Sequence, residues 1–522
     1  MKHTYFPLVL FCFLSQSLLG QFGISLNSPE ALQSYTLFET RFNTHLIDNC
    51  GEIVNTWENA FRTDLHPKLL PNGNLIFIKN NAVFELDWDD NVVQETRHNI
   101  SDLMLDYEVI VLPNGNYLCV ARRIRSSFFF TTQGYNPSLG RPEYDDAIVE
   151  IVPGTGEVVW EWTISDHIIQ ERNPSLANYG KIDENPQLLN LDAISTFDWE
   201  FGESFMINGM DYNADLDQIV LSVRKINEIV IIDHSTTTAE AKGSTGGRYG
   251  KGGDILYRFG NPQNYLPGVS ADRILYFQHN PNWIKYGEHK GKIIIHNNGL
   301  NRPGVNFSDL YSSLEIIDPL MDENGNYELV GGFTFSPLEP NFSYNRITTG
   351  TYFYSGYTSS ARVLSNGNIY ITEGVNDRFL EINPEGEVVW EYTNQFGSYI
   401  FRSEKYPMDY PAFNNKTLIP NGTVEEPSSP YDCKLYTTST AEQIPVALKM
   451  SVKVLNDKLV VDLPSNELFN LDVFDMMGRK VTTKNSIRLV DYDLSIENLN
   501  SGIYIVSVYN QKQQTTEKIF IN

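Results

Sequence analysis

The stretch Leu70-Pro-Asn-Gly-Asn74 decides the fold, because it returns along the chain with a short apolar run after each copy. It recurs as Leu112-Pro-Asn-Gly-Asn116 and as Leu364-Ser-Asn-Gly-Asn368. Asn-Gly supplies the positive φ angles of a tight turn, and apolar runs on both sides of such a turn indicate a β-hairpin. The repeat therefore predicts hairpins that occupy equivalent places in several copies of one module.

A second motif completes this module with a strand that ends near a tryptophan. The segments 151–162 and 382–392 share Gly-Glu-Val-Val-Trp-Glu, so Trp160 and Trp390 should lie at equivalent strand ends, in the core between modules. The first two Asn-Gly turns start 42 residues apart. A period near 40–50 residues with four strands per unit is typical of a β-propeller blade, and the chain has room for about six. The sequence predicts an all-β propeller.

The chain is strongly acidic. It has 522 residues with 39 Lys and Arg against 65 Asp and Glu, which gives a formal charge of −26, and 41% of the residues are hydrophobic. Such a composition buries a sizeable core. The negative charge repels phosphate backbones, so nucleic acid is excluded as a partner. An anionic substrate would need a local positive site.

The N-terminus predicts export. Residues 1–20 combine an early lysine, a short apolar run and a small-residue exit, which is the pattern of a signal peptide. No other stretch is long and apolar enough for a transmembrane segment. Cys50, Cys119 and Cys433 remain after cleavage, so at most one disulfide forms and one thiol is left over. We expect cysteines to contribute little to holding the fold together.

The composition changes near the C-terminus and predicts four segments. Residues 1–20 are the signal peptide, 21–430 the propeller, 431–444 a polar linker and 445–522 a small antiparallel β-sandwich. In the tail, Phe474-Asp-Met-Met-Gly-Arg-Lys-Val481 and the terminal Thr516-Glu-Lys-Ile-Phe-Ile-Asn522 resemble the type A C-terminal sorting domain of the Bacteroidetes type IX secretion system. That resemblance implies the type IX machinery as a partner and delivery to the cell surface (outer membrane) or to the medium.

Motifs for metal, phosphate or serine-nucleophile chemistry are missing from the sequence, so we expect no metal and no cofactor. Polar residues do stand beside strands that should be buried. They are Asn208, Arg224 at the end of Ser222-Val-Arg224, His279 after Gln278, and Thr358 in Tyr354-Ser-Gly-Tyr-Thr358. Taken singly, His279 would be a packed, hydrogen-bonded residue, Arg224 a salt-bridged arginine of the surface or the tunnel, and Asn208 and Thr358 turn residues.

Their order and wording resemble the bacterial aryl-sulfate sulfotransferases, over about residues 35 to 425. The resemblance implies a six-bladed propeller that transfers sulfuryl groups between phenols. His279 matches the family's nucleophile, and Asn208, Arg224 and Thr358 match its sulfuryl-binding residues. The family's Phe-Asp-Asn-Gly segment appears as His296-Asn-Asn-Gly299.

Two family histidines are replaced, by Tyr107 and by Met206. A sulfate ester spreads one negative charge over three oxygens, which an Arg fork, an amide and a hydroxyl can hold. A neutral imidazole can attack sulfur and become a sulfohistidine. Tyr107 could donate a proton or a hydrogen bond, whereas Met206 cannot. We expect His279 to be exposed to the central channel.

Two functions follow from this interpretation. The first is an exported aryl-sulfate sulfotransferase that uses an aryl sulfate as donor and a phenol as acceptor, through a sulfohistidine. The second is a non-catalytic propeller that binds an aryl or sulfated ligand, or a partner protein, at the cell surface. The two lost histidines favour the second, and the four matching residues favour the first.

Overall fold

The computed structural model divides into two compact units, residues 1–436 and residues 437–522. The structure describes residues 22–521 except the segments 61–62, 64–65, 137, 139–141, 196–203, 267–271, 323–324, 346–352, 396–398, 426–430, 437–450, 456–457, 463–468, 476–478, 488–490, 496–498, 500 and 510–513. The predicted signal peptide and the linker residues 437–444 lie outside the described residues. Residues 431–436 of the predicted linker belong to the first unit.

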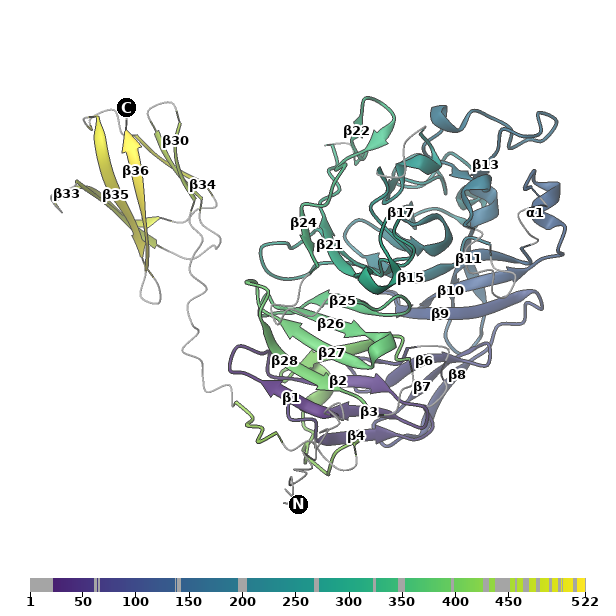
Figure 1. Cartoon of the computed structure of the whole chain (residues 1–522), viewed down its shortest axis with the longest axis horizontal. Coiled ribbons are helices and arrows are strands. Elements are labelled where there is room, and N and C mark those ends of the chain that lie inside the picture. Colours follow the sequence, from purple (N-terminus) through teal and green to yellow (C-terminus); the bar gives the residue numbers. More distant parts are fainter. Residues whose placement is uncertain are drawn as a thin grey trace, which may run out of the picture. The chain divides into compact units, whose positions relative to one another are not determined.

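Antiparallel sheets of four or five strands make up the first unit, and its described residues form six of them (Figure 1). In hydrogen-bonded order their strands are β5 (Lys68–Leu69), β6 (Leu75–Lys79), β7 (Ala82–Leu86), β8 (Val92–Thr96); β9 (Leu103–Val111), β10 (Tyr117–Ile124), β11 (Tyr144–Ile151), β12 (Val158–Thr163); β15 (Ile207–Asn213), β16 (Gln218–Val223), β17 (Glu228–Asp233), β18 (Tyr257–Phe259); β19 (His279–Trp283), β20 (Ile293–Asn297), β21 (Ser313–Ile317), β24 (Phe342–Tyr344); β25 (Ser360–Val363), β26 (Ile369–Glu373), β27 (Arg378–Ile382), β28 (Val388–Thr393), β1 (Gly23–Asn27); and β29 (Ser403–Pro407), β2 (Ser34–Glu39), β3 (Thr44–Ile47), β4 (Ile53–Trp57).

Smaller elements lie between these sheets. They are α1 (Phe129–Thr132), α2 (Thr238–Ala241), the pair β13 (Ile168–Ile169) and β14 (Leu189–Asn190), and the pair β22 (Leu329–Val330) and β23 (Thr334–Phe335). No helix in the described part of the chain has the length and apolar character that crossing a bilayer requires.

The sheets follow one another around a common axis, as the blades of a propeller do. The first strands of successive sheets contact each other, since β9 contacts β15, β15 contacts β19 and β19 contacts β25. Buried apolar clusters fill the space between neighbouring sheets. One cluster joins Leu37 of β2 to Leu75 of β6, and another joins Phe38 of β2 to Trp390 of β28. The all-β propeller predicted from the sequence is confirmed.

The Asn-Gly turns occupy equivalent places, as predicted. The turns at 72–73, 114–115 and 366–367 each connect the first strand of a sheet to the second. Gly73, Gly115 and Gly367 have φ values of 91°, 88° and 88°, and the asparagines before them do not have positive φ. The expectation that both residues of each turn adopt positive φ is therefore wrong. Glycine alone carries the left-handed conformation, because it has no Cβ to clash.

The two tryptophans are equivalent as well. Trp160 lies in β12 and Trp390 in β28, each the fourth strand counted from the axis, and each is paired with a glutamate of the strand before it. Both are buried, with 4% and 0% exposure. They belong to the core between blades and are not ligand platforms.

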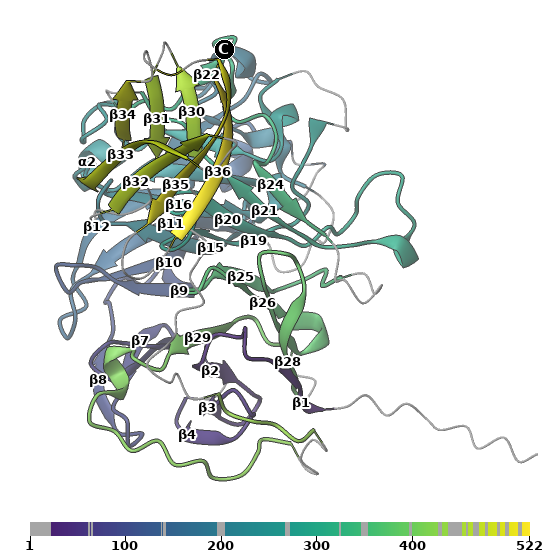
Figure 2. The ribbon, with the colours of Figure 1, turned by 90° about the vertical axis from the view of Figure 1, so that its left-hand side faces the viewer.

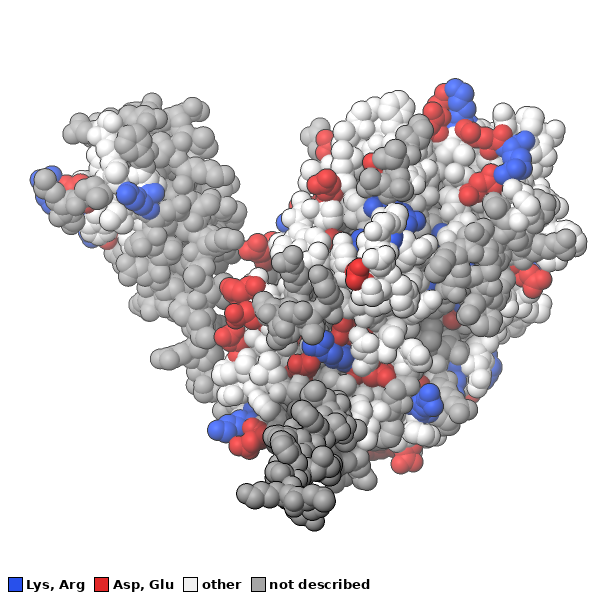
Figure 3. Space-filling view, viewed as in Figure 1, with Lys and Arg blue, Asp and Glu red and all other residues white. Residues whose placement is uncertain are grey.

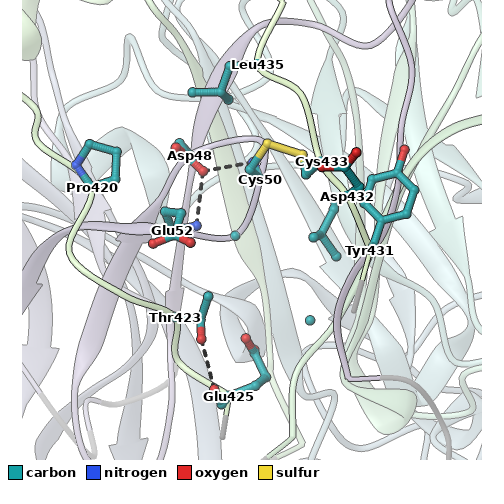
Figure 4. Close-up of a pocket in the computed structure, with 13 residues that line it drawn as sticks. Asp48, Cys50, Glu52, Pro420, Thr423, Glu425, Tyr431, Asp432, Cys433 and Leu435 are labelled. Atoms are coloured by element: carbon teal, nitrogen blue, oxygen red, sulfur yellow. Dashed lines mark hydrogen bonds between the residues drawn. A yellow bond between two sulfur atoms is a disulfide. The ribbon is translucent and has the colours of Figure 1, made fainter. Parts of the chain in front are cut away.

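The two ends of the first unit close the ring together. The C-terminal strand β29 pairs with β2, and the N-terminal strand β1 pairs with β28, so purple and green strands lie side by side in Figures 1 and 2. A disulfide between Cys50 and Cys433 spans 383 residues of sequence near this closure, beside a cavity of about 470 Å³ (Figure 4). Cys119 is free and buried. The count of one disulfide is confirmed, but the expectation that cysteines contribute little to the fold is wrong, because this bond ties the two ends of the ring.

The second unit consists of two antiparallel sheets, as the sandwich prediction requires. One contains β30 (Ser451–Leu455), β31 (Lys458–Asp462) and β34 (Asp491–Ser495). The other contains β33 (Lys480–Ile487), β32 (Phe469–Asp475), β35 (Gly502–Tyr509) and β36 (Gln514–Ile521). Leu471 and Val473 of β32 pair with Val508 and Val506 of β35, and all four side chains are buried.

Candidate functional site

Five residues with side chains have left-handed backbone in, or just before, the first strands of several blades. Tyr107, Met206, Phe277, Asn280 and Thr358 have φ values of 52°, 59°, 56°, 50° and 54°. Such left-handed conformations cost on the order of 1–3 kcal/mol each for residues with a side chain. Strand register also shifts beside three of them, in β9, β15 and β19. Irregularities of this kind re-aim side chains and gather at functional sites, so the axial ends of these strands are the place to look for one.

His279 is the first residue of β19 and lies at this end of the axis. Its side chain is buried, with 4% of the residue exposed, and its ring meets the Phe401 ring edge-on at 5.9 Å between centroids. The expectation of an exposed side chain is therefore wrong. Nδ1 lies 2.6 Å from Oδ1 of Asn298. Among the described residues, Nε2 has no hydrogen-bond partner.

Asn298 fixes the proton on His279. Its Nδ2 donates to the backbone oxygens of Ser355 at 2.7 Å and Thr358 at 2.9 Å, so its Oδ1 is the atom that faces the imidazole. A carbonyl oxygen only accepts, which assigns the proton to Nδ1 and leaves the lone pair on Nε2. The imidazole therefore presents a nucleophilic nitrogen of defined position.

The surroundings keep this imidazole neutral. Burial lowers the pKa of His279 well below its ordinary value, and the positive charges of Arg224 and Arg402 lower it further, against the hydrogen bond to Asn298. A low pKa means that Nε2 carries a free lone pair across the physiological pH range. Neutrality is what a nucleophilic histidine requires.

Arg224 follows β16 and starts a short 3-10 turn, Arg224–Ile226. Its guanidinium lies over the Phe277 ring at 4.7 Å and over the Tyr357 ring at 5.6 Å. Its Nη1 donates to Sδ of Met206 at 3.6 Å. The thioether thus lies beside the guanidinium.

Asn208 and Thr358 join the same network by other atoms. Asn208 Nδ2 donates to the backbone oxygen of Gln278 at 3.0 Å, and its buried Oδ1 has no partner among the described residues. The backbone oxygen of Thr358 accepts from Asn298, while its hydroxyl donates to the oxygen of Tyr357 at 2.7 Å. Asn298 therefore links His279 and Thr358 by hydrogen bonds, and Asn208 holds the backbone of Gln278, the residue before His279.

Tyr107 lies next to this group and not in it. Its ring meets the Phe401 ring at 5.8 Å between centroids, and Arg122 lies over it at 5.2 Å. Phe401 contacts both Tyr107 and His279. The donor role given to Tyr107 stays a prediction.

Three polar residues around the site had no role in the sequence prediction. Asn298 stood in the quoted His296–Gly299 segment, which could have identified it. Glu108 follows Tyr107 directly along the chain. Arg402 has no motif, and its Nη1 donates to Glu108 Oε1 at 2.7 Å, with both side chains buried. Only the closed ring brings Arg402 to the site, so sequence spacing carries no signal for it.

The opposite end of the channel holds a cavity of about 560 Å³. It is lined by charged residues of the six sheets or of the loops at their axial strands, namely Lys68, Glu108, Asp211, Lys285, Arg362 and Glu404. Lys285 lies six residues beyond His279 along β19 and its loop, or roughly 20 Å at the rise of an extended strand. Glu108 links the two ends, because it also binds Arg402. Within the described residues, no cluster of His, Cys, Asp and Glu could hold a metal ion.

The fold and the residues around His279 together define the class of protein. It is a β-propeller with a neutral histidine and an arginine close to its axis. Residues 31–307, just over half of the chain, match the model of the Arylsulfotransferase (ASST) family. The chain belongs to this family. Residues 455–522 match the model of the secretion system C-terminal sorting domain, as the sequence predicted. The protein is an exported member of arylsulfotransferase type.

Comparison with curated proteins gives no match. Solved structures that are similar include a protein of unknown function from Bacteroides caccae, at 11% identity and a TM-score of 0.38, covering 70% of this chain and 94% of that one. Virginiamycin B lyase from Staphylococcus aureus matches at 10% identity and a TM-score of 0.33, covering 72% and 90%. Likenesses at this level carry no argument about substrate or chemistry.

Proposed function

We propose that the protein transfers a sulfuryl group from an aryl sulfate to a phenol, with His279 as the nucleophile. One observation carries the proposal: the neutral His279 is held by Asn298 in the tautomer whose Nε2 lone pair is available. The proposal needs no metal and no cofactor, because imidazole itself carries the group.

In the first step, Nε2 attacks the sulfur of the aryl sulfate. The N–S bond forms as the bond from sulfur to the phenolic oxygen breaks, and the electron pair leaves with the phenolate. The imidazole keeps its proton on Nδ1, which donates to Oδ1 of Asn298. The sulfohistidine therefore has a positively charged ring and a negatively charged sulfuryl group. Tyr107 is the proposed donor that assists the departing phenolate.

In the second step, an acceptor phenol gives its proton to the Tyr107 phenolate that the first step leaves, and its oxygen attacks the sulfur. The N–S electron pair returns to Nε2. Arg224 would hold the sulfuryl oxygens in both steps, with the second N–H of the Asn208 amide. The hydroxyl of Thr358 would join them by turning its one proton from the Tyr357 oxygen to the sulfuryl group. Donors aimed at charge that develops in the transition state are worth about 2.7–4 kcal/mol each.

The contact between Arg224 and Met206 favours a second function. A thioether cannot donate a proton, so a chain with Met206 could bind an aryl or sulfated ligand without turnover. Its readout is separate: such a protein would bind aryl sulfates and release no phenol.

Two parts of the setting are also proposals. The type IX machinery would act as the partner that moves the protein across the outer membrane, and the protein would then stay on the cell surface or enter the medium. Donor and acceptor would both be small phenolic molecules.

The experiment is a phenol-release assay with 4-nitrophenyl sulfate and an excess of phenol. Wild-type protein should release 4-nitrophenol and form phenyl sulfate, whereas His279→Gln should do neither while remaining folded. Release of 4-nitrophenol by the variant at the wild-type rate would remove His279 from the mechanism. Binding without release by the wild type would favour the second function.

A further inference from the structure

We propose that Arg402 and Arg224 together form an oxyanion site beside His279 that takes the sulfonate or sulfate head of an aryl ligand. This deepens the proposed function by adding a residue to its site, and it concerns binding, so it is testable whether or not the protein turns over.

The side chain of Arg402 contacts residues of two sheets that do not neighbour its own. Arg402 directly precedes β29, yet its Nη1 donates to Glu108 of β9 at 2.7 Å. In the amide orientation that satisfies Asn280, the same Nη1 also donates to Asn280 Oδ1 at 3.2 Å, in β19. The sheet of β29 packs against those of β5 and β28, so neither β9 nor β19 lies in a neighbouring sheet. The guanidinium therefore reaches across the channel, to the level of the residue next to His279.

The guanidinium of Arg402 has more hydrogen-bond donors than it uses within the described residues. A guanidinium has five N–H groups, and the hydrogen bonds described above involve only Nη1. Within the described residues, Nε and Nη2 of Arg402 have no hydrogen-bond partner, although the residue is only 2% exposed. A guanidinium edge with two free nitrogens matches two oxygens of a sulfonate.

The buried charges around Arg402 also favour an anionic ligand. Glu108 is the carboxylate that both Lys68 and Arg402 contact, so these three side chains carry one more positive than negative charge. Arg224 adds another positive charge nearby, over the rings of Phe277 and Tyr357. Buried excess positive charge is costly unless an anion offsets it. An oxyanion between the two arginines would supply that charge, inside a protein whose total formal charge is −26.

Arg402 also lies close to a position at which a family histidine is missing. The two histidines missing from the family pattern correspond to Tyr107 and Met206, and each position now adjoins an arginine. Arg224 contacts Met206, and Arg402 contacts Glu108, the residue next to Tyr107. Arg402 would add a second fixed cation to Arg224, which the family pattern already has, where titratable imidazoles are missing.

The experiment measures binding of benzenesulfonate by calorimetry in 0.15 M salt, with benzenesulfonamide as the uncharged counterpart. Arg402→Met should weaken benzenesulfonate binding about tenfold or more and leave benzenesulfonamide nearly unchanged. Arg402→Lys should recover part of the loss, because it restores charge without the fork. Lys285→Met is the control, since it removes one positive charge six residues beyond His279 and should bind as the wild type does.

The variant should fold, because Glu108 keeps Lys68 and the backbone N–H of Met210 as partners. Circular dichroism checks this, and Arg402→Lys serves if Arg402→Met does not fold. Equal affinity in wild type and Arg402→Met, or no binding of benzenesulfonate by the wild type, would overturn the proposal. Sulfonate binding without phenol release would leave it standing and overturn the proposed transfer instead.

Discussion

Glu425 should make the first unit less stable as the pH rises. Glu425 is 1% exposed, and its Oε1 accepts from the hydroxyl of Tyr392. Its Oε2 has no partner among the described residues, and the carboxyl lines the cavity beside the disulfide (Figure 4). Burial raises the pKa of Glu425 to about 7 from the ordinary 4.5. The folded state therefore holds this proton more tightly than the unfolded state does.

The magnitude and sign follow from linkage. A group whose folded pKa is raised contributes stability that is fully present below the unfolded pKa, here near 4.5, and is lost as the pH rises through about 7. A difference of roughly 2.5 pH units corresponds to about 3 kcal/mol. The Gln side chain in Glu425→Gln cannot ionise and keeps an acceptor for Tyr392. The free energy of unfolding of the variant, relative to the wild type, should therefore rise by about 3 kcal/mol between pH 4.5 and pH 8.

The assay is urea unfolding of both proteins across that range, followed by tryptophan fluorescence. All seven tryptophans lie in the first unit, so the signal is specific for it. The difference between the two proteins at the lowest pH is the baseline, which absorbs any change in packing. A difference that stays constant within about 1 kcal/mol over the whole range would refute the reasoning.

Four further outcomes are expected. Arg224→Ala should lower phenol release by about 10²–10³ with the fold intact, measured as kcat/KM; an unchanged value would remove Arg224 from the site. Met206→His should raise the rate if the site is catalytic, and no gain in an active protein would mean that Met206 is not limiting. Replacing Cys50 and Cys433 with alanine should cost about 2–5 kcal/mol in urea unfolding, because the disulfide closes a loop of 383 residues; coincident curves with the wild type would contradict this. Deleting Lys512–Asn522 should leave the protein in the periplasm on cell fractionation, since β36 is lost from its sheet, and normal surface delivery would rule out the sorting role.

Local patterns predicted the blades well. Each predicted motif is formed within one blade by a few neighbouring residues, and it recurs in other blades. These motifs are the turns at 72–73, 114–115 and 366–367 and the strand ends at Trp160 and Trp390. Register and turn chemistry act over short distances, so sequence spacing reports them directly. The conformation of the asparagines in the turns was the part that spacing could not give.

Ring closure explains what was missed. The pairing of β29 with β2, the disulfide between Cys50 and Cys433, and the reach of Arg402 to Glu108 all join segments hundreds of residues apart. No local pattern encodes such contacts. The role of Asn298 was missed for a different reason, because it depends on which way one amide faces, and that follows from the carbonyls of Ser355 and Thr358.

Acidic side chains spread over the face of the first unit seen in Figure 3, with basic ones among them. The excess of acidic side chains in the chain would slow the approach of anionic substrates and leave their recognition to Arg224 and Arg402 near His279. High salt should therefore speed the encounter with an aryl sulfate while weakening its binding to exposed charges.

The most direct test of the central claim is mass spectrometry of the protein after brief incubation with 4-nitrophenyl sulfate, without acceptor, followed by peptide mapping at neutral to alkaline pH. The account predicts one labile sulfuryl adduct, located on His279, which disappears when phenol is added and never forms in His279→Gln. A folded protein that releases phenol while carrying no adduct on His279, or carrying it on another residue, would contradict the account.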